Sequence, residues 1–234
     1  MEKVKVIINS SPRSGHAWLQ WLLLHSLEQK NVHIGDISND DFIIRTNAPV
    51  ILLGRFDGMV QTTILREPKD IIPSIITKTF GGFGNTIASS IAMPHEYNEL
   101  PPKNVFVRDQ IDVYHRWASG IQMNIENLIP FTFDQVTKDP SFTVETILSN
   151  FDRKYNAPNN LDLETLKEKA AMQISMHDKG DIGYNNAVPV DKKPDIYYEL
   201  LDLTLADPRI QELDILYHQV SKSIFDRQER ILNA

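Results

Sequence analysis

The strongest constraint on the fold lies at the N-terminus, where an apolar run meets a polar turn and then an amphipathic segment. Residues 3–9, KVKVIIN, are rich in β-branched side chains and end at serine and proline, which predicts a short buried strand. Apolar side chains then recur at helical spacing over residues 16–30, at Trp18, Leu19, Leu22, Leu23 and Leu27. The sequence therefore begins with a strand, a tight turn over residues 10–15 and a helix.

The alternation of strands and helices continues along the chain. Further strands are predicted at 41–47, 59–66 and 128–133, whereas 49–56 fits either a strand or a buried helical turn. One helix is predicted to begin near Ile71, with Asp70 as its N-cap and Pro73 in its first turn; other helices are predicted at 109–127, 143–151, 161–174, 194–206 and 208–231. Residues 81–84 and 93–104 are predicted loops. We expect one α/β domain over residues 1–234, with three layers and a mainly parallel central sheet flanked by helices.

Composition narrows the possible functions. The net charge of −7, from 24 basic and 31 acidic residues, argues against a general nucleic-acid surface, so a bound anion must be held by local positive charges. The absence of cysteine excludes disulfides and thiolate nucleophiles, and the seven histidines show no metal-binding spacing, so no metal is expected. No segment has the length or apolarity of a membrane span, and we expect a soluble, cytoplasmic protein. The oligomeric state cannot be predicted from the sequence.

The turn between the first strand and helix has the chemistry of an anion site. A helix N-terminus presents unpaired N–H groups and the positive end of the helix dipole. Gly15 allows close approach to the backbone, Arg13 adds charge and donors, and Ser11 and Ser14 add hydroxyls. The nucleotide-binding pattern G-x-x-x-x-G-K-[ST] is absent. The simpler alternative is a helix entry that merely carries polar residues.

A second block, LREPKDIIPS at residues 65–74, repeats this arrangement. Arg66 ends a predicted strand, and Ser74 follows about two turns into the next helix. The carboxyl end of a parallel strand is where open α/β sheets bind ligands. Arg66 is therefore a stronger candidate for ligand binding than an arginine elsewhere on the surface.

Taken together, PRSGxxW at residues 12–18 and R-x-P-x-D-x-x-x-S at residues 66–74 resemble the sulfotransferase family, whose members use 3′-phosphoadenosine-5′-phosphosulfate (PAPS) as sulfuryl donor. The resemblance implies an α/β fold of the P-loop-containing nucleoside triphosphate hydrolase-like (sulfotransferase) type. It also implies transfer of a sulfuryl group from PAPS to a hydroxyl or amine of a small-molecule or glycan acceptor. Two later segments, IPFTFDQVTKDP at 129–140 and DKGDIGY at 178–184, resemble family segments less closely.

The resemblance further implies a role for each matching position. The loop that holds the 5′-phosphosulfate would consist of Ser11, Pro12, Arg13, Ser14, Gly15, His16 and Ala17. Trp18 and Phe133 would contact the adenine, and the 3′-phosphate would be bound by Arg66, Ser74, Lys179 and Gly180. Simpler alternatives are that Trp18 and Phe133 belong to the core and that Lys179 is solvated.

The chain departs from the family pattern at the expected catalytic base. In IIRTNAPV, residues 43–50, Arg45 retains the positive charge expected near the sulfuryl group, but Asn47 stands where the family has histidine. An amide cannot accept the acceptor's proton as a base. His16 replaces a phosphate-binding hydroxyl and is one candidate base; Asp57, His95 and Glu96 are others by loop position alone. The catalytic candidates are Arg13, Arg45 and His16.

Three functions remain open at this point. The first is the sulfotransferase. The second is a non-catalytic protein that binds PAPS or its product, 3′-phosphoadenosine-5′-phosphate (PAP), after loss of the base. The third is a different P-loop enzyme such as a small-molecule kinase, which the missing Gly-Lys-Ser/Thr disfavours.

Overall fold

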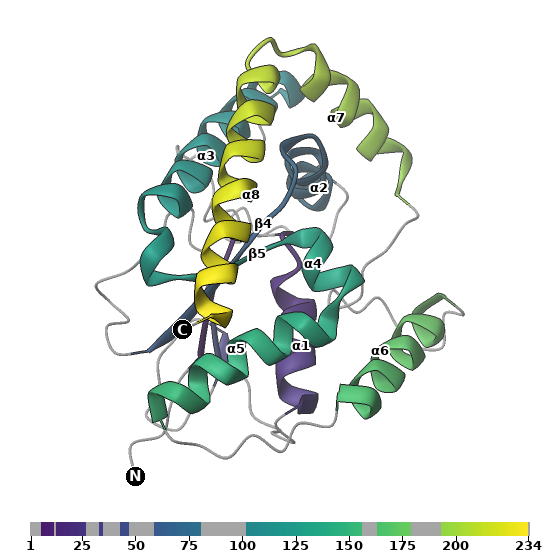
Figure 1. The fold of residues 1–234 in the computed structure, drawn as a ribbon. Coiled ribbons are helices and arrows are strands. Elements are labelled where there is room, and N and C mark those ends of the chain that lie inside the picture. Colours follow the sequence, from purple (N-terminus) through teal and green to yellow (C-terminus); the bar gives the residue numbers. More distant parts are fainter. Residues whose placement is uncertain are drawn as a thin grey trace.

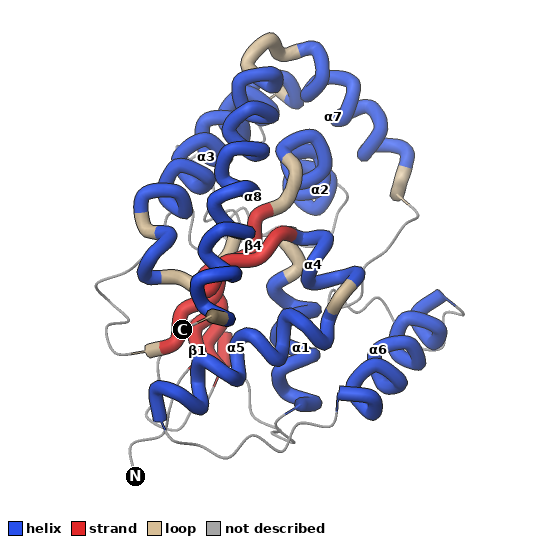
Figure 2. Tube along the Cα trace, viewed as in Figure 1, coloured by secondary structure: helices blue, strands red, loops and turns tan. Residues whose placement is uncertain are grey.

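The computed structural model shows a small parallel sheet among a larger number of helices (Figures 1 and 2). The structure describes residues 6–11, 13–26, 33–34, 43–46, 59–80, 102–155, 163–178 and 193–233. The undecided segment at 49–56, the predicted loop at 81–84 and residues 93–101 of the predicted loop at 93–104 lie outside these residues. The end of that loop prediction is wrong, because residues 103 and 104 are helical.

All five strands of the sheet are parallel, in the order β2-β3-β1-β4-β5. The strands are β1 (Val6–Asn9), β2 (His33–Ile34), β3 (Ile43–Thr46), β4 (Val60–Leu65) and β5 (Ile129–Thr132). All residues of β1, β4 and β5 are buried, as expected of parallel strands covered on both faces. The predicted strands at 3–9, 41–47, 59–66 and 128–133 are confirmed as β1, β3, β4 and β5 over the residues that the structure describes. The sequence did not predict β2, which is too short to carry a periodic pattern.

The helices are α1 (His16–Ser26), α2 (Pro68–Phe80), α3 (Lys103–Met123), α4 (Phe133–Lys138), α5 (Pro140–Tyr155), α6 (Leu163–Asp178), α7 (Asp195–Ala206) and α8 (Ile210–Leu232), with a 3₁₀ turn at Ile125–Asn127. Each predicted helix is present, with bounds that differ by a few residues. The largest shift is in α3, which begins at Lys103 instead of residue 109.

The structure corrects the sequence prediction at the start of one helix and adds a helix that was not predicted. The second helix begins at Pro68, so Asp70 lies in its first turn and is not its N-cap. Pro68 is tolerated there because the first N–H groups of a helix have no partner within it, whereas Pro73 lies inside the helix. The unpredicted helix α4 follows β5 directly. Its start is stabilised by a capping box, in which Thr132 and Gln135 exchange hydrogen bonds between side chain and backbone.

The apolar core consists of two clusters. One cluster packs α1, α4, α5 and α6 against Val6, Ile8 and Ile64 of the central strands. The other packs α2, α3, α7 and α8 beyond Leu65 at the end of β4. In Figure 1 α1, α5 and α6 lie below the end of β4 and α2 and α7 lie above it, whereas α8 runs past it and contributes Ile231 to the first cluster. Consecutive residues of a strand point to opposite faces, so Ile64 and Leu65 belong to different clusters.

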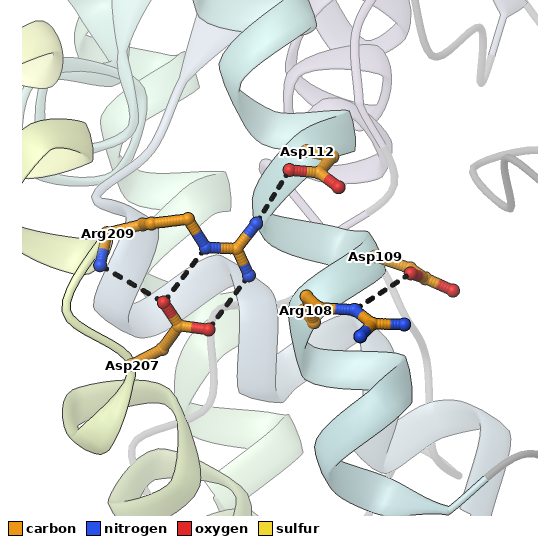
Figure 3. Close-up of polar contacts among 5 residues, drawn as sticks. All are labelled: Arg108, Asp109, Asp112, Asp207 and Arg209. Atoms are coloured by element: carbon orange, nitrogen blue, oxygen red, sulfur yellow. Dashed lines mark hydrogen bonds and ion pairs between the residues drawn. The ribbon is translucent and has the colours of Figure 1, made fainter.

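Ion pairs among Asp207, Arg209 and Asp112 connect the turn between α7 and α8 to α3 (Figure 3). The Arg209 guanidinium donates from Nε and Nη2 to the two carboxylate oxygens of Asp207, at 3.0 and 2.8 Å. Its Nη1 donates to Asp112 Oδ1 on α3 at 2.9 Å. The hydrogen bonds from Arg209 lower the pKa of Asp207. The bidentate pair with Asp207 fixes the Arg209 guanidinium within the turn, and the bond to Asp112 connects it to α3.

The described part of the chain contains no helix with both the length and the apolarity needed to cross a bilayer.

Removal of a buried aromatic side chain provides a test of the core. Phe131 on β5 is fully buried and its ring meets that of Phe142 edge to face, with the ring centroids 6.4 Å apart. Phe131→Ala should lower the free energy of unfolding by about 3–5 kcal/mol because it opens a cavity. Phe225→Ala is the matched control, since Phe225 is 52% exposed on α8 and should change stability by about 0.5 kcal/mol or less. Urea denaturation measures both; equal losses would contradict the core assignment.

Candidate functional site

The candidate site lies at the carboxyl ends of two strands, β1 and β4. From β1 the chain enters α1, which packs on the sheet in one apolar cluster, and from β4 it enters α2, which belongs to the other cluster. The strands β1 and β4 are neighbours. A crevice outside the carboxyl ends of two such strands is the usual ligand position in open α/β sheets. Both motif blocks therefore reach the same edge of the sheet.

A network of serines shapes the turn after β1. Ser10 Oγ accepts a hydrogen bond from the Ile64 N–H at 3.1 Å, so the first residue past β1 stays attached to β4. Ser10 Oγ lies 2.7 Å from Ser14 Oγ, and Ser14 Oγ donates to the Ser11 carbonyl at 2.6 Å. The Ser14 hydroxyl is thus used inside the turn. Its predicted contact with an anion would require these bonds to rearrange, because Ser14 is fully buried.

The backbone of the turn is left-handed at two positions. Gly15 has φ of 94°, which glycine adopts easily, but Arg13 has φ of 64°, which costs a side-chain-bearing residue roughly 1–2 kcal/mol. A Cβ on Gly15 would also lie 3.0 Å from the nearest ring carbon of Phe133. Arg13 therefore holds an unfavourable conformation that its surroundings must stabilise.

Hydrogen bonds join the two motif blocks. Arg13 Nε donates to Ser74 Oγ at 3.2 Å, from the turn after β1 to the second turn of α2. Arg66 Nη1 donates to the Arg13 carbonyl oxygen at 2.9 Å. Arg13 thus contacts two other predicted ligand-binding residues, Arg66 and Ser74, which lie more than fifty positions later in the sequence. The resemblance pairs Ser74 with Arg66, whereas in the structure Ser74 bonds directly to Arg13.

Arg66 is enclosed on several sides. Its guanidinium carbon lies 4.2 Å from the centroid of the Phe133 ring, in cation–π contact. Tyr114 of α3 donates its hydroxyl hydrogen to the Arg66 carbonyl at 2.9 Å. Arg66 Nε is buried without a hydrogen-bond partner among the described residues. Burial lowers the pKa of Arg66, and the neighbouring Asp70 opposes this effect.

The start of α7 adds a tyrosine beside this cluster. Tyr197 donates its hydroxyl to Asp70 Oδ1 at 3.5 Å, and Lys193 Nζ lies 5.8 Å from the centroid of the Tyr197 ring. Burial and the Asp70 carboxylate raise the pKa of Tyr197 to about 12. The tyrosine is therefore a neutral hydrogen-bond donor at neutral pH and not a base.

His16 turns back toward the preceding loop. Its Nδ1 lies 3.3 Å from the Ser11 carbonyl oxygen, and the residue is only 9% exposed. In the neutral ring this bond places the proton on Nδ1 and the lone pair on Nε2. Ala17 follows in the same first turn of α1.

Trp18 lies in the apolar core. It is 2% exposed, and its indole Nε1 donates to the Val136 carbonyl at 3.2 Å. Its ring also stacks on Trp21, with the centroids 5.0 Å apart and the planes at 2°. This burial favours the simpler alternative for the residue, and its contact with adenine stays a prediction.

Arg45 lies in β3, where its backbone is in register with Ile8 of β1, one strand away from the turn. Pro12, Lys179 and Gly180 lie outside the described residues, as do Asn47, Asp57, His95 and Glu96. Among the residues that the structure describes, no group of three or more His, Cys, Asp or Glu side chains could hold a metal ion.

Sequence reasoning missed three neighbours of the site, namely Ser10, Tyr114 and Tyr197. Ser10 carries a weak signal, since it directly follows a strand in the same polar turn. Tyr114 and Tyr197 lie on amphipathic helices, where helical spacing predicts burial but not which backbone group a hydroxyl will reach.

The arrangement brings two arginines, a serine hydroxyl and a left-handed turn together at a helix N-terminus, which suits an anionic group such as phosphate or sulfate. No protein-family model and no curated protein matches this sequence.

Gly15 provides a test of the turn. Gly15→Ala should lower the free energy of unfolding by about 1–3 kcal/mol, because the new Cβ is strained at this φ and meets Phe133. Ala17→Ser, two residues later in an ordinary helical turn, is the control and should change stability by about 0.5 kcal/mol or less. Thermal and urea unfolding measure both variants. A Gly15→Ala protein as stable as the wild type would contradict the described turn.

The raised pKa of Tyr197 predicts alkaline sensitivity. Tyrosine in an unfolded chain loses its proton near pH 10, whereas Tyr197 in the folded protein does so near 12. The folded protein holds this proton more tightly, so the free energy of unfolding should fall as pH rises from about 10 to about 12. Tyr197→Phe should flatten this slope, measured by urea denaturation at several pH values. An unchanged slope would show that Tyr197 does not titrate as described.

Proposed function

We propose that this protein is a PAPS-dependent sulfotransferase with a P-loop-like sulfotransferase fold, acting on a hydroxyl or amine of a small-molecule or glycan acceptor. One observation carries the proposal: the hydrogen bond between Arg13 Nε and Ser74 Oγ joins the two sequence blocks that resemble the family. They meet beside the ends of β1 and β4, where an α/β sheet binds its ligand.

The described residues fit a phosphorylated nucleotide. A cradle forms at Gly15, where a side chain would collide with Phe133. Arg66 Nε is a buried donor without a partner among the described residues. Arg13 and Ser74 would contact a phosphate group, with the positive charge of Arg66 beside them. Phe133 stays a predicted neighbour of the adenine, since it is only partly buried.

In the proposed reaction the acceptor oxygen or nitrogen forms a bond to sulfur, while the bond between sulfur and the bridging oxygen of the 5′-phosphate breaks. The acceptor's proton passes to a base, and the products are the sulfated acceptor and PAP. The protein's main contributions are alignment of the two reactants and stabilisation of charge on the leaving phosphate. Arg13 would supply that stabilisation from the turn, and Arg45 is the proposed second cation.

The two candidate functions differ in whether the site contains a base. His16 Nε2 is one candidate, because Nδ1 is directed to the Ser11 carbonyl. Asn47 in place of the family's histidine favours the second candidate function, a protein that binds PAPS or PAP without catalysis. Loss of a general base typically costs about 10²–10⁴ in rate, which leaves measurable activity possible. A kinase is disfavoured because ATP has no 3′-phosphate for this site.

Calorimetric titration with PAP, beside AMP and ATP, tests the donor site. The wild type should bind PAP more tightly than AMP, because AMP lacks the 3′-phosphate. Arg13→Ala should weaken PAP binding about tenfold to hundredfold, as expected for loss of a charged hydrogen bond. Arg116→Ala is the matched control, since Arg116 is an exposed arginine on α3 and its removal should leave affinity within about twofold.

Each outcome of the titration has a definite meaning. PAP binding that depends on the 3′-phosphate and on Arg13 supports the proposal, and an acceptor screen with labelled PAPS then separates the enzyme from the non-catalytic binder. Binding of ATP alone, or of none of the three nucleotides, contradicts both PAPS functions.

A further inference from the structure

Two contacts fix the position of the Arg66 guanidinium in the site. Its Nη1 donates to the Arg13 carbonyl at 2.9 Å, and its guanidinium lies on the Phe133 ring at 4.2 Å. The Phe133 ring lies beside Gly15, and its nearest carbon is 3.0 Å from the position that a Cβ on Gly15 would take. Arg66 is therefore linked to both left-handed residues of the turn, to Arg13 directly and to Gly15 through the aromatic ring.

The main chain of Arg66 is also held in place. Tyr114 on α3 donates its hydroxyl to the Arg66 carbonyl at 2.9 Å. Tyr114 is 4% exposed, so this bond is shielded from water. The guanidinium therefore extends from a fixed backbone toward a turn whose Arg13 conformation is unfavourable by itself.

We propose that Arg66 is a positioning residue, which holds Arg13 in its left-handed conformation so that the Arg13 guanidinium meets Ser74 and the ligand. The inference rests on the proposed function as far as the ligand is concerned, but the positioning itself concerns the free protein. It differs from the role that the resemblance implies, in which Arg66 binds the 3′-phosphate as an independent contact.

The geometry and the charge of the Arg66 side chain can be tested separately. Lysine keeps the positive charge of arginine but lacks the planar fork that can stack on a ring and donate in a fixed direction at once. If Arg66 mainly supplied charge to the ligand, Arg66→Lys would retain most of the affinity. If Arg66 holds the turn, Arg66→Lys should lose nearly as much as Arg66→Ala.

The first experiment is a double-mutant cycle on PAP affinity. Arg66→Lys and Arg66→Ala should each weaken PAP binding about tenfold or more. In an Arg13→Ala background, Arg66→Ala should add at most about threefold, because the residue through which it acts is gone. Circular dichroism and the thermal midpoint establish that each variant is folded. Retention of affinity within threefold by Arg66→Lys, or losses that multiply in the double variant, would overturn the inference.

The second experiment needs no ligand. Hydrogen exchange followed by mass spectrometry on the free protein reports on the amides of residues 13–19. Arg66→Lys should speed their exchange at least severalfold, because the turn loses its external restraint. Arg209→Lys is the matched control, since Arg209 also uses its fork but binds Asp207 and Asp112 at the α7–α8 turn. It should leave exchange at 13–19 unchanged.

The two experiments separate failure of the inference from failure of the proposed function. If the wild type binds no PAP, the proposed function fails, and exchange in the free protein decides the positioning role alone. Faster exchange in Arg66→Lys but not in Arg209→Lys then supports the role. Wild-type exchange in a folded Arg66→Lys protein overturns it, whatever the nucleotide result.

Discussion

The hydrogen bond from Arg66 to the Arg13 carbonyl is the contact on which the rest of the site depends. It joins the residues that follow two neighbouring strands, at the point where the chain enters helices of two different apolar clusters. Without this bond, the two segments would be connected through the Arg13–Ser74 hydrogen bond, through Ser10 and through the strand pairing. The bond therefore joins the residues after β1 and those after β4 into one polar surface.

A third strand takes part through packing. Phe133 follows β5 directly, and the capping box at Thr132 and Gln135 fixes how α4 leaves that strand. This geometry places the Phe133 ring between the Arg66 guanidinium and Gly15. The requirement for glycine at position 15 is consequently set by β5 and α4 as well as by the turn itself. The segment at 129–140 therefore shapes the site through the packing of Phe133, in addition to any contact that it makes with a ligand.

Sequence reasoning was most successful where a periodic pattern met a polar turn. It identified β1, α1 and β4, and it selected Arg13, Gly15, Arg66 and Ser74, which the structure brings together. It misplaced the start of α2, because Pro68 and Asp70 are both typical of a helix start and only the backbone shows which comes first. Trp18 illustrates a different limit, since an aromatic residue beside a ligand loop and one in the core have the same helical spacing. The pairing of Ser74 with Arg13 depends on the approach of two loops, which no local pattern encodes.

The acidic neighbours of the arginines have a consequence for how quickly a ligand arrives. Arg66 interacts with Asp70 and Asp134 as well as with Arg13, and the whole chain carries a net charge of −7. A nucleotide approaching from a distance therefore meets a repulsive field, and it is attracted only within a few ångströms of the turn. Moderate salt would weaken the long-range repulsion more than the short-range attraction, because the arginines are partly shielded from solvent. The net negative charge therefore slows the diffusional capture of a nucleotide at this edge of the sheet. The positive charge of the arginines prolongs the residence of an anion once it is bound.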